Sequence, residues 1–402
     1  MPLFRSIITL GLLIFLGCAS PSVHENALPW KSALFNQERV NVTKEQVVLP
    51  LKRKALYSIW TFSDLLHPHG LSLSASPVIK DNTAYLGNGS GEFHAINLIN
   101  KSTIWRMDTK SQIDTSATLD GDVLYFGTGE GVIHSLDRES GEELWRYETK
   151  ATILASPLIV GDILYVASAD NRIYAIEKET GKVRWQYGRR GGRQIGARIM
   201  ASPASEGERV YHLFSDGHLL SLDRTTGKVI WEKPVFDPTL LNIWRGRKSP
   251  LLAGNSIFII DGEGAVMQID KESGKELKSY NQFRAVDFIV RDNIIFLVGN
   301  ERIAAIRVDS GEVEWRKKLE DISPLSAFGA GDYIFVLSNM TRRPLGIDLF
   351  AQKMGRVDGF NVKSGDLYRV DEFNSAITAN AVFSGNRLLI VVDKGFVVSY
   401  SP

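Results

Sequence analysis

The sequence repeats one pattern about eight times, and this repetition restricts the fold more than any other feature of the chain. Each copy has a small-residue or Ser-Pro opening, an apolar run that ends near a Tyr, a Gly-rich turn, an Ala-Ile or Ser-Leu pair, a Thr/Ser-Gly pair and a Trp. The third copy is the clearest, with Ser156-Pro157, Tyr165, Ala175-Ile176, Thr180-Gly181 and Trp185. A period of about 40 to 50 residues with several short strands indicates a β-propeller or a solenoid.

The two ends of the repeat array favour the propeller. Trp60 precedes the first full copy, whereas the last copy, from Ala379 to Tyr400, has no Trp or Gly-turn tail. If residues 56–60 add the outermost strand to the sheet of the last copy, the ring closes and leaves no unprotected edge. We therefore predict an all-β fold: an eight-bladed β-propeller of four-stranded antiparallel blades, closed by an N-terminal strand that pairs with the C-terminal blade.

Within each copy, two inner strands are expected to be buried on both faces, because apolar residues fill segments such as 163–166 and 173–176. The Gly of the Thr-Gly pair suits a tight turn. The Trp that follows has a large apolar area that would wedge between adjacent blades. The 352 residues from Leu51 onward give 44 per blade, so we expect the ring to use nearly all of them and to leave no second domain.

The N-terminus has the pattern of a bacterial lipoprotein signal peptide. Arg5 is followed by an apolar stretch from Ile7 to Leu16 and then by Gly17, Cys18 and Ala19. The stretch is shorter than the about 20 residues that span a bilayer, so an uncleaved anchor is the weaker alternative. Cys18 is the only cysteine and the expected site of lipid attachment, with a buried structural thiol as the alternative. We predict a signal peptide over 1–17, a lipidated N-terminus and linker over 18–50, and one propeller domain over 51–402.

The sequence shows no catalytic or metal-binding constellation. The seven histidines lack metal-ligand spacing, and His94 and His134 occupy the same slot in successive copies, as ordinary strand residues would. Gly-rich runs such as 87–91 recur at the repeat period and lead into strands, which indicates hairpins rather than nucleotide sites. A net charge of +1 gives no reason to expect nucleic acid as a partner. We therefore predict no enzyme activity, no cofactor and no metal.

The repeat resembles that of the quinoprotein enzymes, which use pyrroloquinoline quinone. The likeness is best seen from Ser221 to Trp231, where Leu222-Asp223 is followed by Thr226-Gly227. Those dehydrogenases are longer, and many carry a disulfide between adjacent cysteines against the cofactor. This chain has one cysteine and cannot form that bond. A cofactor-dependent oxidoreductase is therefore a minor hypothesis.

The combination of a lipoprotein signal, eight quinoprotein-type repeats and about 400 residues resembles the BamB-like lipoproteins of the outer-membrane β-barrel assembly machinery. The resemblance covers essentially the whole chain. It implies a non-enzymatic scaffold that binds a BamA-like barrel-inserting outer-membrane protein and other subunits of the machinery, and that aids delivery of unfolded outer-membrane proteins. Ala19 does not resemble the Asp associated with inner-membrane retention. We expect the protein to lie at the periplasmic face of the outer membrane and to contact the membrane through its lipid anchor only.

Three connections are longer than the repeat requires, and we expect partner binding there. They cover residues 186–201, 232–248 and 341–358, and all are rich in Arg or Lys. Aromatic, aliphatic and Arg side chains together are typical of interface anchors, while a solvated loop is the alternative interpretation. The candidate partner-binding residues are Arg193, Ile195, Arg198, Trp244, Arg245 and Arg247.

The resemblance to the family supports partner binding through residues 186–201 better than through residues 232–248. Ile195 and Arg198 match a Leu-x-Leu-Arg partner-binding segment of the family, whereas Ala197 does not. Where the family has Asp-x-Asp, this chain has Arg245-Gly246-Arg247, so the charge is reversed. A second hypothesis follows: a propeller lipoprotein that binds a different periplasmic partner or an anionic envelope glycan through basic inter-blade loops. Such binding should weaken with salt.

Overall fold

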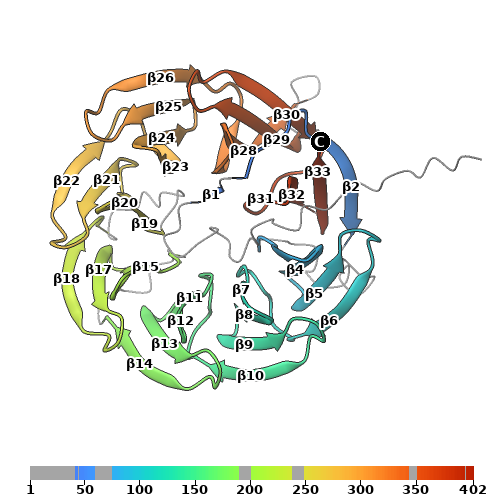
Figure 1. Cartoon of the computed structure of the whole chain (residues 1–402), viewed down its shortest axis with the longest axis vertical. Coiled ribbons are helices and arrows are strands. Elements are labelled where there is room, and N and C mark those ends of the chain that lie inside the picture. The colour runs from blue at the N-terminus through green and yellow to red at the C-terminus, as the bar shows by residue number, and fades with distance from the viewer. Residues whose placement is uncertain are drawn as a thin grey trace, which may run out of the picture.

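The computed structural model describes residues 41–43, 45–58, 75–189, 201–237, 249–343, 351–393 and 395–402. Within these residues the regular structure is all β, and eight antiparallel sheets stand around a central axis as the blades of a propeller (Figure 1). The predicted fold class and number of blades are therefore confirmed. No described segment forms a helix with the length and apolar character needed to span a membrane.

In each blade the four strands of the repeat follow one another from the central axis outward (Figure 1). Blade 1 has β3 (Val78–Lys80), β4 (Thr83–Gly87), β5 (Glu92–Asn97) and β6 (Thr103–Asp108). Blade 2 has β7 (Thr118–Asp120), β8 (Val123–Gly127), β9 (Val132–Asp137) and β10 (Glu143–Glu148). Blade 3 has β11 (Leu158–Val160), β12 (Ile163–Ser168), β13 (Arg172–Glu177) and β14 (Val183–Gly188). Blade 4 has β15 (Ala204–Glu206), β16 (Arg209–Leu213), β17 (His218–Asp223) and β18 (Val229–Pro234).

The later blades follow the same order. Blade 5 has β19 (Leu251–Ala253), β20 (Ser256–Ile260), β21 (Val266–Asp270) and β22 (Glu276–Tyr280). Blade 6 has β23 (Ala285–Arg291), β24 (Ile294–Gly299), β25 (Arg302–Arg307) and β26 (Val313–Lys318). Blade 7 has β27 (Ser323–Ala330), β28 (Tyr333–Arg342), β29 (Gln352–Asn361) and β30 (Leu367–Phe373). Blade 8 has β31 (Val382–Ser384), β32 (Arg387–Val392), β33 (Phe396–Ser401) and, as its outermost strand, β2 (Lys52–Ser58).

The ring closes through the N-terminal strand β2, as predicted. β2 pairs antiparallel with β33, and Leu56, Tyr57 and Ser58 lie opposite Val398, Val397 and Phe396. Trp60, which suggested this closure in the sequence, lies outside the described residues. Pairing β2 with β33 protects the edge that the last copy would otherwise expose.

The segment before β2 adds a feature that the repeat did not predict. Strand β1 (Val42–Thr43) pairs parallel with β27 and makes blade 7 five-stranded. Asn41 is buried, its side chain donates a hydrogen bond to the carbonyl of Ala327, and its own carbonyl accepts one from Gly329 N at 3.0 Å. The chain therefore runs from the inner edge of blade 7 to the outer edge of blade 8.

Burial within the blades follows the predicted pattern. The second and third strands are almost wholly buried, whereas outermost strands such as β6, β10 and β18 are largely exposed on both faces. The outermost strand also delivers the Trp to the next blade: Trp145 packs against the turn that contains Gly181, where an added Cβ would lie 2.8 Å from the indole. The same packing joins Trp105, Trp185, Trp231 and Trp315 to a glycine of the next blade. The predicted wedge is confirmed.

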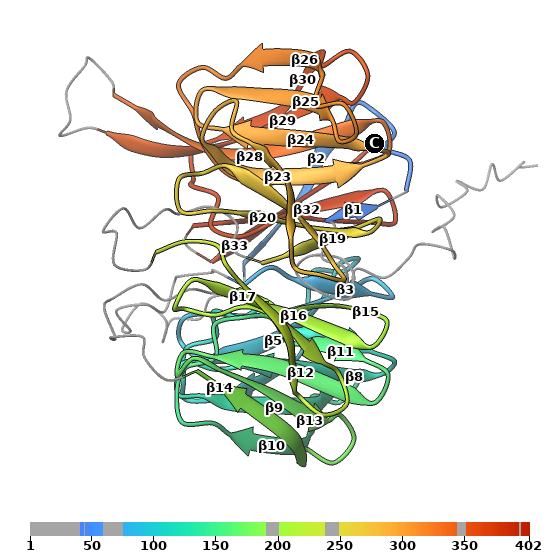
Figure 2. The same cartoon turned by 90° about the vertical axis from the view of Figure 1, so that its left-hand side faces the viewer.

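The strand order makes the two ends of the ring different. In blades 1 to 7 the chain turns at one end between the first and second strands and between the third and fourth strands, and in blade 8 it turns there between the first and second; we call this end the turn face. The hairpins between the second and third strands, and the connections from one blade to the next, lie at the opposite end, which we call the loop face. In Figure 2 the loop face is at the left, where β28 and β29 extend beyond the other blades.

Candidate partner-binding face

All three long connections identified in the sequence belong to the loop face. The connection from β14 to β15 joins blades 3 and 4, and the one from β18 to β19 joins blades 4 and 5, so both start where an outermost strand ends. The third joins β28 to β29, the second and third strands of blade 7. The six candidate partner-binding residues, Arg193, Ile195, Arg198, Trp244, Arg245 and Arg247, lie outside the described residues.

The first connection begins at an arginine that the fold holds in place. The guanidinium of Arg189 forms ion pairs with Asp216 in the β16–β17 turn and with Glu232 on β18, the latter with Nη1 and Oε2 2.7 Å apart. Its side chain is 16% exposed. Burial disfavours its charge, but the hydrogen bonds to the two carboxylates outweigh this and raise the pKa of Arg189. Arg189 is therefore a clamp between blades 3 and 4.

A second contact joins the same two blades at this face. The side-chain carbonyl of Asn171 accepts hydrogen bonds from the backbone N and the hydroxyl of Ser215, at 2.8 and 2.9 Å. Asn171 has a φ of 63° in the β12–β13 turn, a conformation that Asn tolerates better than most residues. Blades 3 and 4 are thus fixed to each other directly beneath the start of the first connection.

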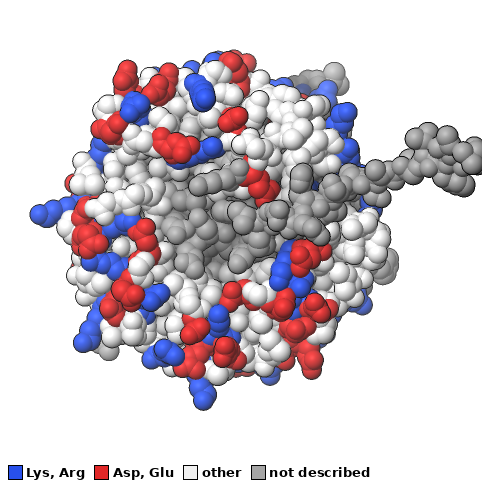
Figure 3. All heavy atoms as spheres, in the orientation of Figure 1, with Lys and Arg blue, Asp and Glu red and all other residues white. Residues whose placement is uncertain are grey.

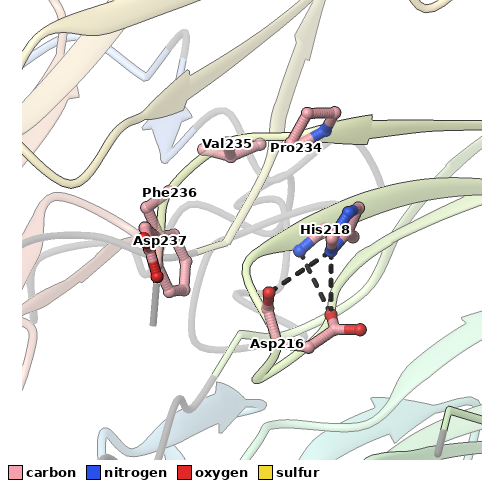
Figure 4. A pocket seen from close by; sticks show the side chains of 6 residues that line it. All are labelled: Asp216, His218, Pro234, Val235, Phe236 and Asp237. Carbon is pink, nitrogen blue, oxygen red and sulfur yellow. Dashed lines mark hydrogen bonds and ion pairs between the residues drawn. The ribbon is translucent and has the colours of Figure 1, made fainter. Parts of the chain in front are cut away.

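A cavity of about 450 Å³ opens on the loop face beside the second connection. It is lined by Asp216 and His218 on one side and by 234–237 on the other, as Figure 4 shows. The Nδ1 atom of His218 lies 3.5 Å from Oδ1 of Asp216 and 3.3 Å from its backbone oxygen. Because the carboxylate of Asp216 already pairs with Arg189, the side chains of Val235 and Phe236 are what this cavity offers, and they suit an apolar side chain of a partner.

This cavity could not be predicted from the repeat pattern. Asp216 and His218 occupy the hairpin turn that every copy contains, and Val235 and Phe236 follow the last strand of the copy in ordinary loop positions. Only the pairing of β17 with β18, in which His218 lies opposite Pro234, brings the two segments together. The repeat predicts this pairing of neighbouring strands, but it does not predict which side chains leave a cavity beside it.

The turn face has a different electrostatic character. Acidic and basic side chains are interspersed around the ring on this face (Figure 3). Arg138 pairs with Asp122 at 3.0 Å, Lys178 with Asp120 at 2.7 Å, and Arg224 with Glu208 at 3.2 Å. These ion pairs neutralise part of the charge that this face presents to a partner.

The buried histidines agree with their interpretation as strand residues. His94 lies opposite Leu86 and His134 opposite Phe126, so they do share one slot in successive blades, and both are buried. Burial lowers the pKa of His134, although a contact of 2.6 Å with Glu143 opposes this effect. Burial alone lowers the pKa of His212 to about 3. Among the described residues no group of three His, Cys, Asp or Glu side chains could hold a metal ion.

The sequence matches one protein-family model. Residues 99–317 match the family described as outer membrane protein assembly factor BamB. The matched segment extends from the end of β5 in blade 1 to the outermost strand of blade 6. No curated protein has a sequence that matches the chain.

Several solved structures share the fold. BamB from Moraxella catarrhalis is 19% identical, with a TM-score of 0.68 over 88% of this chain and 100% of that one. The quinohemoprotein alcohol dehydrogenase from Comamonas testosteroni is 13% identical, with a TM-score of 0.70 over 92% of this chain and 80% of that one. A europium-containing methanol dehydrogenase is 11% identical, with a TM-score of 0.72 over 93% of this chain and 98% of that one. At these identities the likeness shows the propeller fold alone.

Proposed function

This chain belongs to the family of outer membrane protein assembly factor BamB, and from this membership we propose that it is a non-enzymatic scaffold of the outer-membrane β-barrel assembly machinery. In this proposal Cys18 carries lipid, and the ring stands at the periplasmic face of the outer membrane. The scaffold binds a BamA-like barrel-inserting protein and aids delivery of unfolded outer-membrane proteins. The match to the family model over residues 99–317 is the observation that carries the proposal.

The loop face is the proposed binding surface. The two connections that contain Arg193, Ile195, Arg198, Trp244, Arg245 and Arg247 leave from either side of blade 4. Arg189 and Asn171 fix blade 3 to blade 4 there, so the start of the first connection is preorganised. The cavity lined by Asp216, His218 and Phe236 lies at the start of the second connection and is shallow and open, so a partner side chain could contact its apolar wall there.

The test is a photo-crosslink in cells from position 198, with mass spectrometry of the adduct. The expected adduct is a barrel-inserting outer-membrane protein. A matched control carries the same photo-reactive residue at Glu139 on the turn face, whose side chain is 77% exposed, and should not give that adduct. An adduct of equal yield from both positions, or none from position 198, would count against the proposed site.

The reversed charge at Arg245 and Arg247 favours a second candidate function. In this alternative the same loops bind a different periplasmic partner or an anionic envelope glycan. Binding dominated by these charges should weaken steeply between low and high salt, because exposed charges are screened over about 10 Å at 0.1 M. Binding of a folded protein that does not respond to salt would instead indicate an apolar anchor at Trp244.

A further inference from the structure

A groove of about 370 Å³ lies between blades 6 and 7, away from the two basic connections beside blade 4. One side of the groove is formed by the end of β26 and by the connection from β26 to β27. The other side is formed by residues of β28, β29 and β30, among them Met340, Arg356 and Leu367. Both blades therefore contribute side chains to this groove.

Arg356 is the most buried of the charged side chains that line the groove. Its side chain is 9% exposed, and its Nε atom donates a hydrogen bond of 2.6 Å to Oδ2 of Asp358. Among the described residues no acceptor is found for its Nη1 and Nη2 atoms, and neither atom is fully enclosed. Because Arg356 lines the groove, Nη1 and Nη2 are donors that the groove presents to a ligand.

Asp358 fixes the direction of this guanidinium. Its carboxylate is fully buried; Oδ2 accepts from Arg356, and Oδ1 accepts from Nε of Arg369 at 3.3 Å. Arg356, Asp358 and Phe360 share one face of β29, because side chains two residues apart on a strand point the same way. Phe360 belongs to the same hydrophobic cluster as Trp315 of blade 6. The buried ion pair is thus part of the interface between the blades, and only the Nη end of Arg356 remains for a ligand.

The groove has no excess of positive charge. Nη1 of Arg369 lies 3.0 Å from Oε1 of Glu372, and Nζ of Lys318 lies 3.3 Å from Oε1 of Glu320. Asp321 adds a further carboxylate to the lining. These carboxylates would repel a phosphate-rich or polyanionic ligand, whereas directed N–H groups can hold a single carboxylate.

The rest of the lining indicates what lies next to that carboxylate. Leu367 is 51% exposed, and Met340, a side chain that adapts to varied shapes, is partly buried. These two residues suit an aliphatic side chain. The exposed carboxylates of Glu320 and Asp321 can accept hydrogen bonds from backbone N–H groups. A carboxylate, an aliphatic side chain and backbone N–H groups occur together in a polypeptide.

We propose that this groove binds one carboxylate of a polypeptide, which Nη1 and Nη2 of Arg356 hold through a bidentate pair of hydrogen bonds. The carboxylate is either the C-terminus of a chain or the side chain of an Asp or Glu that has an aliphatic neighbour. This inference goes beyond the proposed function, because it does not involve the connections that contain Arg198 and Trp244.

The first experiment measures the fluorescence anisotropy of four labelled peptides with the purified full-length protein. Two peptides end in Leu-Leu and differ only in a free or an amidated C-terminus. The other two are amidated and contain Leu-Glu-Leu or Leu-Gln-Leu. We expect a carboxylate peptide to bind at least about tenfold better than its neutral partner, because hydrogen bonds to charged groups are stronger than neutral ones. An advantage in the first pair identifies a C-terminus as the ligand, and an advantage in the second pair identifies an acidic side chain.

Two variants test whether Arg356 is the binding residue. Arg356→Lys keeps a cation beside Asp358 but has one nitrogen instead of three, so the advantage of the carboxylate peptide should be lost. Leu367→Glu places a like charge in the groove without changing the buried ion pair, and it should weaken binding of that peptide by about tenfold. The matched control is Leu277→Glu, which makes the same change at a 57% exposed side chain of β22 in blade 5.

The outcomes separate a specific groove from general electrostatics. Loss in Leu367→Glu with retention in Leu277→Glu supports the proposal. Equal affinity for the charged and neutral peptides of both pairs, no binding of any peptide, equal effects of the two Leu variants, or a folded Arg356→Lys that keeps the full advantage would overturn it. If thermal melting shows that Arg356→Lys does not fold, the two Leu variants still decide. A photo-crosslink from position 198 that succeeds while peptide binding fails would leave the proposed function intact and remove this inference alone.

Discussion

The indole N–H of Trp105 in blade 1 donates a hydrogen bond of 2.9 Å to the backbone carbonyl of Arg138 in blade 2. Arg138 is the residue directly after β9, so the bond ties an outermost strand to the turn face of its neighbour. Trp145, Trp185, Trp231 and Trp315 make the same bond to Lys178, Arg224, Lys271 and Val362, at 2.8 to 3.0 Å. The Trp of each repeat therefore contributes a directional bond as well as apolar area.

Trp105→Phe should lower the free energy of unfolding by about 1 to 3 kcal/mol. The Phe keeps most of the packing against Gly141 but leaves the carbonyl of Arg138 without this donor. Urea denaturation monitored by circular dichroism would measure the change. Tyr147→Phe is a suitable control, since no hydrogen bond of the Tyr147 hydroxyl is found among the described residues. Equal midpoints for the two variants would show that the indole bond adds nothing.

At two junctions between neighbouring blades, the hydroxyl of a Tyr donates the hydrogen bond that the indole N–H of a Trp donates elsewhere. In blade 5 the slot of the Trp holds Lys278, opposite Gln268, and Tyr280 two residues later donates its hydroxyl to the carbonyl of Val308 at 3.0 Å. In blade 8 the hydroxyl of Tyr57 donates to the carbonyl of Leu98 at 2.8 Å. The acceptor is again the residue that follows the third strand of the next blade. At these two junctions the bond between blades is thus retained although the Trp of the motif is absent.

Tyr280→Phe should cost about 1 kcal/mol of unfolding free energy, because Tyr280 is fully buried and its hydroxyl lies 3.0 Å from both the carbonyl of Val308 and the side-chain oxygen of Gln268. Lys278, whose Nζ lies 3.3 Å from the carbonyl of Val308, remains as a donor to it. The measurement is again the urea midpoint. Leu277→Ala on the same strand, at a side chain that is 57% exposed, should change the midpoint much less. A larger loss from Leu277 than from Tyr280 would contradict the proposed equivalence of Tyr280 and the repeat Trp.

Gly227→Ala should destabilise the protein more than Gly207→Ala. Both glycines have positive φ, 71° and 57°, so both variants carry the strain of about 1 to 2 kcal/mol that a Cβ causes in that conformation. Only at Gly227 does the new Cβ also meet a side chain, 2.6 Å from the indole of Trp185; at Gly207 it meets nothing within 4 Å. We expect thermal melting to show a difference of about 1 to 3 kcal/mol between the variants. Equal losses would mean that the indole moves aside without cost.

The fold could be predicted from the sequence because each repeat slot has a local cause. For example, the tight turn in blade 3 requires a glycine at position 181, and the contact between blades 2 and 3 requires a large apolar side chain, that of Trp145. The unmatched ends of the repeat array imply that the ring closes through Tyr57 and its neighbours. The parallel strand Val42–Thr43 could not be predicted, because two residues carry no period and their pairing with β27 spans almost the whole chain. Such contacts are determined by how the blades are arranged in space and not by a local sequence pattern.

The site was less predictable than the fold. The sequence placed binding residues on long basic loops but did not distinguish Arg189, which the ring uses as a clamp, from the arginines that follow it. It also made no prediction for the conformation of residues 341–358, whose described parts continue β28 and β29 as two paired strands. Predicting these longer strands requires knowing that the neighbouring strands pair only as far as Asn339 and Gly355.

Stability should fall as the pH drops below about 6.5, and His212 should account for part of the slope. Burial lowers the pKa of His212 to about 3 in the folded protein, so only the unfolded chain binds a proton there between about pH 6.5 and pH 3. The unfolded state binds more protons, and stability is lost on acidification at up to about 1.4 kcal/mol per pH unit in that window. His212→Leu should reduce the slope of unfolding free energy against pH between pH 6 and 5. An unchanged slope would mean that the imidazole is protonated in the fold.

Arg189 and Arg198 should separate stability from binding, although they are nine residues apart on the same connection. Arg189→Ala removes the partner of Asp216, which is 14% exposed, and of Glu232, so it should cost about 1 to 3 kcal/mol of unfolding free energy. Under the proposed function, Arg198→Glu should leave the urea midpoint unchanged and abolish the photo-crosslink to the barrel-inserting protein from a neighbouring position such as 193. A lower urea midpoint in Arg198→Glu would show that Arg198, like Arg189, stabilises the fold. A photo-crosslink that persists in Arg198→Glu would show that the barrel-inserting protein does not bind through this connection.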